Sequence, residues 1–219
     1  MIFGKIDYIN LLPFYVFLKK NIKSSQQKAI MNWKKSYPSD INKMFKMRQI
    51  DAALISSIKS QKEKCSNVGI ISRKDVLSVL CIRGKYKKDE HSSTSNILAK
   101  ILNTDGQVVI GDKALKLFFQ NQNKDDIIDL GLQWFEKYSL PFVYARLCFN
   151  KNNKTFNKLS KKFLNTKTKI PMYILNKKAK SIDISISQLN IYLSKISYKI
   201  GKNEQKSLKL FFKLSKNYN

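Results

Sequence analysis

Histidine is almost missing from this sequence of 219 residues, and cysteine, arginine, glycine and proline are scarce. The single histidine, His91, lies in a polar stretch, which excludes metal sites built on a histidine pair and gives little support to a Ser-His or Cys-His dyad. We therefore expect His91 to be a solvated loop residue. No G-x-x-x-x-G-K-[ST] or G-x-G-x-x-G motif occurs either, so we expect neither a nucleotide cofactor nor a metal ion.

The three cysteines, Cys65, Cys81 and Cys148, are far apart and include no C-x-x-C spacing. A small and odd number of widely spaced cysteines argues against a disulfide framework and against a zinc site. It favours cysteines that are small buried side chains in a reducing compartment. Long apolar runs are also missing. The run over 9–18 is interrupted by an asparagine and a proline, is too short to span a bilayer and is not followed by a cleavage site. We therefore expect a cytoplasmic protein without a membrane partner.

Acidic residues are few, and 42 lysines and arginines against 15 aspartates and glutamates give a formal charge of +27. Such a charge suggests a nucleic-acid or anionic-membrane partner. Only four of the basic residues are arginines, however, and the lysines are spread singly and in pairs over every segment. Direct readers of bases and phosphates depend on the arginine fork. The sequence therefore does not favour nucleic-acid binding as the main role.

The opening stretch GKIDYINLLPF, residues 4–14, is predicted to run from a strand directly into a helix. Asn10 lies at the turn between them, and Pro13 begins a segment whose apolar residues recur at helical spacing. Such a turn places Asn10 at the carboxyl edge of a sheet, where open α/β folds bind ligands. The plain alternative is that Asn10 is only a turn residue.

Short polar residues follow other predicted strands or open other predicted helices in the same way. Besides Asn10, the residues at these junctions are Ser56, Ser57, Thr94, Ser95, Gly111 and Asp112. Taken singly, each is explained as a helix cap or a turn residue. Taken together, they are expected at the facing edges of two α/β domains. A cleft lined by hydroxyls and helix N-termini, with few ionisable side chains, suits a small anion that carries carboxylates.

The remaining predicted elements divide the chain into two lobes. We expect further strands over 29–33, 51–55, 68–71, 76–82, 107–110 and 142–149, helices over 38–48, 92–102, 113–119 and 127–138, and mainly helices from 154 onward. The charged stretch 84–91 indicates a boundary, and the strand 142–149 is expected to return beside 76–82. The predicted fold is therefore α/β, with a discontinuous lobe, 1–83 and 146–219, and an inserted lobe, 84–145, joined by two crossing strands.

Several blocks of the sequence resemble one family, the chorismate dehydratases of the futalosine route to menaquinone. The blocks are, in order, GKIDYINLLPF, DAALISS, VLSVL after ISRKDV, STS before a helix, VVIGDKAL and LQWFEKYSLPFVYARLCFN, followed by ISYKIG and LKLFFKLS near the C-terminus. Any single block is weakly specific, whereas the ordered set is specific. The resemblance covers most of residues 1–150 and the C-terminal end.

The resemblance implies a type II periplasmic-binding-protein-like fold used as an enzyme, without a metal or redox cofactor. The implied reaction removes water from the dianion chorismate to give aromatic 3-[(1-carboxyvinyl)oxy]benzoate, which needs orientation and charge placement more than a strong base. By the same resemblance, the substrate site comprises Asn10 over the reacting ring, Ser56, Thr94 and Ser95 on carboxylates, and Ser57, Gly111, Asp112 and Phe142 around them.

The sequence also departs from the family pattern. Ser93 stands where we expect an arginine, so an anion contact is either missing or supplied by a lysine, and the segment 84–92 is short for the family. Two alternatives stay open. The sister dihydroxynaphthoate synthase of the same route has an opening block like SPCPNDT and is expected to use a histidine, and a non-catalytic small-anion binding protein is compatible with the fold. With no histidine in the predicted cleft, we favour the substrate's own enolpyruvyl carboxylate as proton acceptor and leave the oligomeric state open.

Overall fold

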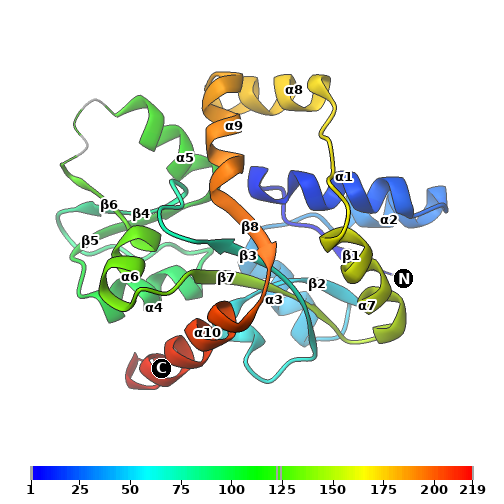
Figure 1. Cartoon of the computed structure of the whole chain (residues 1–219), viewed down its shortest axis with the longest axis horizontal. Coiled ribbons are helices and arrows are strands. Elements are labelled where there is room, and N and C mark those ends of the chain that lie inside the picture. The colour runs from blue at the N-terminus through cyan, green and yellow to red at the C-terminus, as the bar shows by residue number, and fades with distance from the viewer. Residues whose placement is uncertain (1, 122, 124, 219) are drawn as a thin grey trace.

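The structure is a computed structural model that describes residues 2–121, 123 and 125–218, without the side chains of 31–33. Its strands form two separate sheets (Figure 1). The strands are β1 (Phe3–Gly4), β2 (Ala52–Ser56), β3 (Cys65–Ser72), β4 (Val79–Arg83), β5 (Gly106–Ile110), β6 (Ile127–Asp129), β7 (Phe142–Phe149) and β8 (Ile196–Lys199).

Helices surround both sheets. They are α1 (Leu12–Asn21), α2 (Ser25–Trp33), α3 (Pro38–Lys46), α4 (Ser93–Leu102), α5 (Gly111–Gln120), α6 (Leu130–Tyr138), α7 (Asn153–Leu164), α8 (Met172–Ile182), α9 (Ile186–Lys195) and α10 (Lys202–Ser215), with short 3-10 turns η1 (Ile9–Leu11), η2 (Ser57–Ser60) and η3 (Lys216–Tyr218). Within the described residues, none of these helices combines the length and the apolar character needed to cross a membrane.

The larger sheet has the strand order β1-β2-β7-β3-β8. The sequence explains its centre, because the AALIS segment of β2 is buried at every position, as expected for a strand covered on both faces. Strand β1 runs parallel to β2, whereas β7 is antiparallel to both β2 and β3. Parallel strands end at the same edge of a sheet, so the η1 turn after β1 and Ser56 at the end of β2 lie at one edge.

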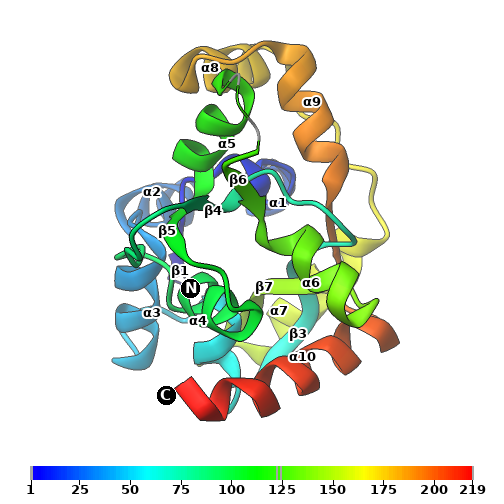
Figure 2. The ribbon, with the colours of Figure 1, turned by 90° about the vertical axis from the view of Figure 1, so that its left-hand side faces the viewer.

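The smaller sheet has the order β5-β4-β6, and Figure 2 views the molecule from the side on which this sheet lies, with α4, α5 and α6 around it. Trp134 of α6 is fully buried, and its ring packs edge-on against Phe142 of β7 and Phe211 of α10. Its Nε1 atom donates to Ser207 Oγ at 3.1 Å. This side chain therefore ties the helical layer of the smaller sheet to the larger sheet and to the C-terminal helix.

Two connections join the sheets: residues 73–78 lead from β3 to β4, and residues 139–141 lead from α6 to β7. The partly buried Asp129 carboxylate accepts hydrogen bonds from the backbone N–H groups of Val76 and Leu77 at 2.9 and 2.7 Å. The same carboxylate caps α6 by accepting two further N–H groups from its first turn. One side chain thus fixes the first connection to the start of a helix.

Four predictions about the elements are wrong, and one of them is the helix over 127–138, whose first three residues form β6 instead. The segment 29–33 is part of α2 instead of a strand, because the Ser24 hydroxyl caps a helix there by accepting from the Gln27 N–H. Strand β7 does not return beside 76–82; it pairs with β2 and β3, while β4 pairs with β5 and β6. The segment 196–199 is a strand in a region expected to be mainly helical. Periodicity predicts an element but does not identify its partner.

The sheets also bear on where the lobes divide. Strand β4 lies wholly in the smaller sheet, and β7 lies wholly in the larger one. We propose that the lobes divide within 73–78 and 139–141, a few residues before the predicted boundaries at 83/84 and 145/146. The larger lobe is then discontinuous, and the smaller lobe is inserted into it.

Two cysteines differ from the prediction of free, reduced side chains. Cys65 and Cys148 are joined by a disulfide bond, while Cys81 is free and buried. The pairing of β3 with β7 places Cys65 directly opposite Cys148. Their separation of 83 residues gives no sign of this contact, because it depends on a strand pairing that the sequence did not predict.

We predict that Asp129→Ala lowers the free energy of unfolding by about 2–4 kcal/mol, because several backbone N–H groups lose their acceptor and α6 loses its cap. Urea denaturation followed by circular dichroism measures this. As a control, Asp105→Ala removes an exposed carboxylate from the same lobe and should change the free energy by less than about 0.5 kcal/mol. Similar losses in the two variants would contradict the role of Asp129.

Candidate active site

A narrow cavity of about 70 Å³ lies between the two lobes. We call it the inner cavity. It is lined by Ile6, Tyr8, Asn10, Leu11, Pro38, Leu54, Ser56, Ile70, Val76, Ser78, Val79, Ser92, Ser95, Ile110, Gly111, Tyr144 and Ala145. Four of the predicted site residues, Asn10, Ser56, Ser95 and Gly111, are thus brought together from both lobes.

Asn10 is the middle residue of η1, which passes directly into α1 with Pro13 in the first helical turn. The Tyr198 hydroxyl of β8 donates to the Asn10 carbonyl oxygen at 2.7 Å and holds the backbone of the turn. The side-chain Oδ1 atom of Asn10 is buried and has no hydrogen-bond partner within the described part of the chain. An unpaired buried acceptor costs on the order of 1–3 kcal/mol, so this atom marks a position where a ligand can bind.

Ser56 is held in place by a residue that the sequence did not single out. Asn42 of α3 accepts from the Ser56 N–H at 3.1 Å and donates through Nδ2 to Ser56 Oγ at 2.8 Å. Because the Ser56 oxygen already accepts one hydrogen bond, its O–H is oriented to donate to another atom. A hydroxyl donor of this kind suits a carboxylate. The sequence did not indicate this role for Asn42, because an asparagine inside a polar helix is common.

The smaller lobe contributes the N-terminus of α4. Ser92 caps this helix by accepting from the Ser95 N–H at 3.1 Å, and the two hydroxyls are 2.7 Å apart. Both serines line the inner cavity, so the positive end of the helix dipole lies at its wall. Ser92 is not among the site residues predicted from the sequence.

Gly111 begins α5 with a φ of 68°, and its N–H donates to the Ser78 carbonyl at 2.8 Å. A Cβ atom at this position would lie only 2.7 Å from the ring of Tyr8. Tyr8 of the larger lobe therefore packs directly on the backbone of the smaller lobe. A side chain at position 111 would separate the two lobes at the cavity wall.

The side-chain oxygens of Ser57 and Thr94 form hydrogen bonds outside the inner cavity. The Ser57 hydroxyl donates to the Val143 carbonyl at 2.6 Å, and Thr94 Oγ1 accepts from the Ile58 N–H at 3.2 Å. Both side chains are buried and connect the end of β2 to neighbouring elements. Their predicted contact with a substrate stays a prediction that needs these bonds to rearrange.

Phe142 and Asp112 also lie outside the inner cavity. Phe142 is 1% exposed and packs among Trp134, Tyr144 and Phe211. Asp112 accepts a hydrogen bond from the Ile9 N–H at 3.0 Å, across the gap between the lobes. Asp112 therefore contacts the turn that carries Asn10, and a direct substrate contact stays a prediction for both residues.

Ionisable groups are few around the inner cavity. Among the described lining residues they are Tyr8 and Tyr144, and burial raises the pKa of both phenols, so both are neutral near pH 7. Among the described residues, the lining of the inner cavity includes no lysine or arginine, and Ser93 itself is exposed. No positively charged side chain in this lining therefore takes the place of the arginine that we expected at position 93. The described residues also contain no group of three or more His, Cys, Asp and Glu side chains that could hold a metal ion.

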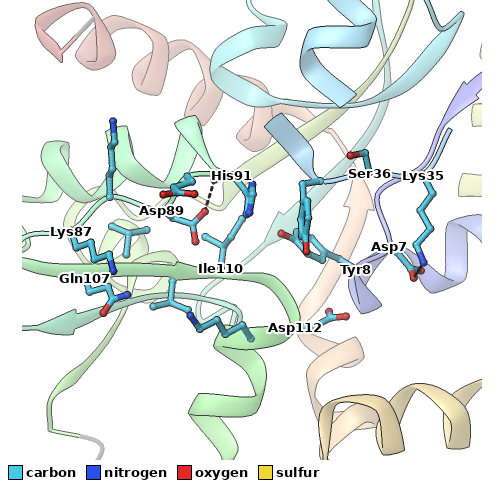
Figure 3. A pocket seen from close by; sticks show the side chains of 16 residues that line it. Asp7, Tyr8, Lys35, Ser36, Lys87, Asp89, His91, Gln107, Ile110 and Asp112 are labelled. Carbon is cyan, nitrogen blue, oxygen red and sulfur yellow. Dashed lines mark hydrogen bonds and ion pairs between the residues drawn. The ribbon is translucent and has the colours of Figure 1, made fainter. Parts of the chain in front are cut away.

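A second cavity of about 760 Å³ lies beside the inner one and shares Tyr8 and Ile110 with it (Figure 3). We call it the outer cavity. In Figure 3, His91 and Ile110 of the smaller lobe lie on one side of the view, and Tyr8 of the larger lobe lies on the other. Charged residues of both signs line the outer cavity, namely Asp7, Lys35, Lys87, Lys88, Asp89, Glu90, Asp112 and Lys113.

His91 is not the solvated loop residue that the sequence predicted. Its ring stacks on Tyr37 with centroids 4.1 Å apart and an angle of 6°, and its Nδ1 atom lies 3.3 Å from Ser39 Oγ. Tyr37 and Ser39 belong to the larger lobe and His91 to the smaller one. The lobes therefore also meet at the wall of the outer cavity.

Asp7, which also lines the outer cavity, forms ion pairs with lysines. It pairs with Lys35 at 2.7 Å and with Lys178 of α8 at 3.1 Å. Burial raises the pKa of Asp7, but hydrogen bonds and charge from these lysines outweigh burial, and the pKa lies below its ordinary value. Asp7 is therefore ionised and holds α8 against the opening segment.

Comparison with known protein sequences decides the family. A family model described as menaquinone biosynthesis matches residues 77–217. The chain is also 48% identical, over 223 aligned residues, to the chorismate dehydratase of Campylobacter jejuni subsp. jejuni serotype O:23/36 (strain 81-176). This match covers 100% of this chain and 99% of that protein. The chain belongs to the menaquinone biosynthesis family.

Solved structures support the fold expected of this family member. A structural-genomics protein from Archaeoglobus fulgidus matches with a TM-score of 0.64 and 9% identity, over 98% of this chain and 96% of that chain. The periplasmic aliphatic sulphonate binding protein of Escherichia coli matches with a TM-score of 0.53 and 13% identity, over 97% and 92%. At such low identities the matches show the fold alone. The predicted periplasmic-binding-protein-like α/β fold is confirmed.

We predict that Gly111→Ala lowers the free energy of unfolding by about 2–4 kcal/mol, because the new methyl group overlaps the Tyr8 ring. A double-mutant cycle measured by urea denaturation isolates this contact. In the Tyr8→Ala background the same substitution should cost less by about 1–3 kcal/mol, since the overlap is gone. Additive effects of the two substitutions would show that Tyr8 and Gly111 are not in contact.

Proposed function

We propose that this protein is a chorismate dehydratase of the futalosine route to menaquinone, acting in the cytoplasm and without a metal or redox cofactor. In this role it removes water from chorismate to give 3-[(1-carboxyvinyl)oxy]benzoate. The observation that carries the proposal is the 48% identity to a chorismate dehydratase over the full length of both chains. A match of that extent includes both lobes and every residue around the inner cavity.

The polar groups of the inner cavity support a carboxylate ligand. The hydroxyls of Ser56, Ser92 and Ser95 and the N-terminus of α4 lie on its wall, and all of them favour negative charge. Lysines line the outer cavity next to it, and the net charge of +27 attracts a dianion over a longer range. In this proposal, the lysines therefore attract the substrate toward the site, and uncharged hydrogen-bond donors bind it there.

The elimination needs a proton acceptor as well as a binding site. A ring proton and the ring hydroxyl leave as water, and the ring becomes aromatic. The ionisable lining residues that the structure describes are Tyr8 and Tyr144, whose raised pKa values make them neutral. A neutral phenol is a poor base, which supports the substrate's own enolpyruvyl carboxylate as the acceptor. Asn10 then acts by holding the ring in the reactive orientation through its free Oδ1 atom.

The size of the inner cavity adds a step to this proposal. At about 70 Å³, the inner cavity leaves little free room between the lobes. In this proposal the lobes separate to admit the substrate, with the movement taken up by the connections 73–78 and 139–141. The reaction then takes place between lobes that have closed again on the substrate.

Incubation of the purified protein with chorismate tests the proposal. Appearance of the ultraviolet spectrum of a substituted benzoate, with the product mass confirmed by mass spectrometry, is the expected result. Tight binding of chorismate without turnover would instead identify a small-anion binding protein. Turnover of a cyclic futalosine derivative, with none of chorismate, would identify the sister dihydroxynaphthoate synthase. Binding to DNA at physiological ionic strength is not expected.

We predict that Asn10→Ala lowers kcat by at least about 100-fold with little change in stability, because a contact that positions the reacting ring is lost. Steady-state kinetics with chorismate and thermal denaturation measure the two effects. Asn157→Ala, an exposed asparagine on α7, is the matched control and should keep wild-type turnover. Wild-type turnover in Asn10→Ala would remove Asn10 from the site.

A further inference from the structure

The turn that carries Asn10 is held at two peptide groups, one on each side of the Ile9–Asn10 peptide, by residues far away in the sequence. The Ile9 N–H donates to Asp112 Oδ1 at 3.0 Å, across 103 residues. The Asn10 carbonyl accepts from the Tyr198 hydroxyl at 2.7 Å, across 188 residues. The two bonds fix the backbone on both sides of the Asn10 side chain.

These two bonds come from different lobes. Tyr198 lies on β8 of the larger sheet, and the η1 turn follows β1 of the same sheet. Asp112 lies in the first turn of α5, next to Gly111 in the smaller lobe. The bond from Ile9 to Asp112 therefore exists only when the lobes are close, whereas the bond to Tyr198 does not depend on their separation.

The turn has no cap of its own. The residue before η1, Tyr8, makes no side-chain cap hydrogen bond, so the first N–H groups of the turn lack a local acceptor. The Asp112 carboxylate supplies the acceptor that a local serine or aspartate supplies in most helices. The cap of the Asn10 turn is thus carried by the opposite lobe.

We infer that Asp112 is a positioning residue, whose carboxylate orders the Asn10 turn when the lobes close and thereby couples closure to the correct placement of the Asn10 amide. This inference rests on the proposed function and reassigns Asp112 from a predicted substrate contact to a contact with the enzyme's own backbone. Tyr198 holds the turn in both the open and the closed protein. Chorismate bound between open lobes then meets an Asn10 side chain that is not yet fixed.

The surroundings of Asp112 give this coupling a dependence on pH. The groups that act on it are Asp7 and Tyr8 of the opening segment, Lys178 of α8 and Tyr192 of α9. Burial raises the pKa of Asp112 to about 6, while the Ile9 hydrogen bond and Lys178 act in the opposite direction. Above this pH the carboxylate is ionised and accepts strongly from the Ile9 N–H. As the pH falls through about 6 it gains a proton, and the cap weakens.

Hydrogen exchange of the Ile9 amide tests the contact without any substrate. In the wild-type protein this amide should be protected, and in Asp112→Ala it should exchange at least about tenfold faster. Asp112→Asn retains an acceptor oxygen and should keep most of the protection. Asp125→Ala, an exposed carboxylate on the same lobe, is the control and should change nothing. Unchanged exchange of Ile9 in Asp112→Ala would overturn the inference, whether or not the protein turns over chorismate.

Kinetics with chorismate test the consequence for Asn10. Asp112→Ala should lower kcat by about 10- to 100-fold with a smaller change in KM, since the turn is misplaced and substrate contacts remain. Asp112→Asn should stay within a few-fold of wild type at pH 8 and lack the decline of kcat/KM that we expect of the wild type below about pH 6. Tyr198→Phe should lower kcat while keeping that decline.

A rise in KM alone in Asp112→Ala would instead identify a direct substrate contact. An Asn variant as slow as the Ala variant at every pH would show that the charge itself takes part in the chemistry; either result overturns the inference. A wild-type protein without turnover, but with Asp112-dependent protection of Ile9, would reject the proposed function and leave the backbone contact intact.

Discussion

The contact between Tyr8 and the backbone at Gly111 is the constraint on which the site depends. The two lobes approach closely there because position 111 has no side chain, and a Cβ atom would overlap the Tyr8 ring. That approach brings Asp112 within hydrogen-bond distance of the Ile9 N–H. It also brings Ser92 and Ser95 to the same cavity as Ser56 and Asn10. One missing side chain thus allows groups from two lobes to act on one small ligand.

The inner cavity relies on neutral donors and placed backbone instead of charged side chains. Asn42 orients the Ser56 hydroxyl, Ser92 is bonded to Ser95, and Tyr198 holds the backbone of Asn10. Preorganised dipoles of this kind need no rearrangement during a reaction, and they stabilise charge more effectively where water is excluded. Such a site suits an elimination that is driven by formation of an aromatic ring. The excess of lysine over the outer surface then affects encounter with a dianion more than the chemistry.

The local junctions were predictable from the sequence, because strand-to-helix transitions leave a signal in consecutive residues. Ser56 and Gly111 lie directly at such junctions, Asn10 and Ser95 lie where helices begin, and the structure brings all four to one cavity. The partners of strands were not predictable. The return of β7 between β2 and β3 depends on packing of the whole chain, and the disulfide between Cys65 and Cys148 depends on that pairing.

Residues that support the site from a distance were missed for the same reason. Asn42 and Tyr198 lie inside ordinary helical or mixed segments, and only the three-dimensional contacts give them a role. Ser57 and Thr94 show the opposite case, since hydroxyls expected at the site bond to backbone elsewhere. A short polar residue at a junction can cap, brace or bind, and its neighbours in sequence do not distinguish these roles.

A crystal structure with 3-[(1-carboxyvinyl)oxy]benzoate bound is the most direct test of this account. The account predicts that the aromatic ring lies between the lobes against Asn10 Oδ1, with carboxylates on the hydroxyls of Ser56 and Ser95. A ring bound instead among the lysines of the outer cavity, with the Asn10 side chain out of contact, would contradict it.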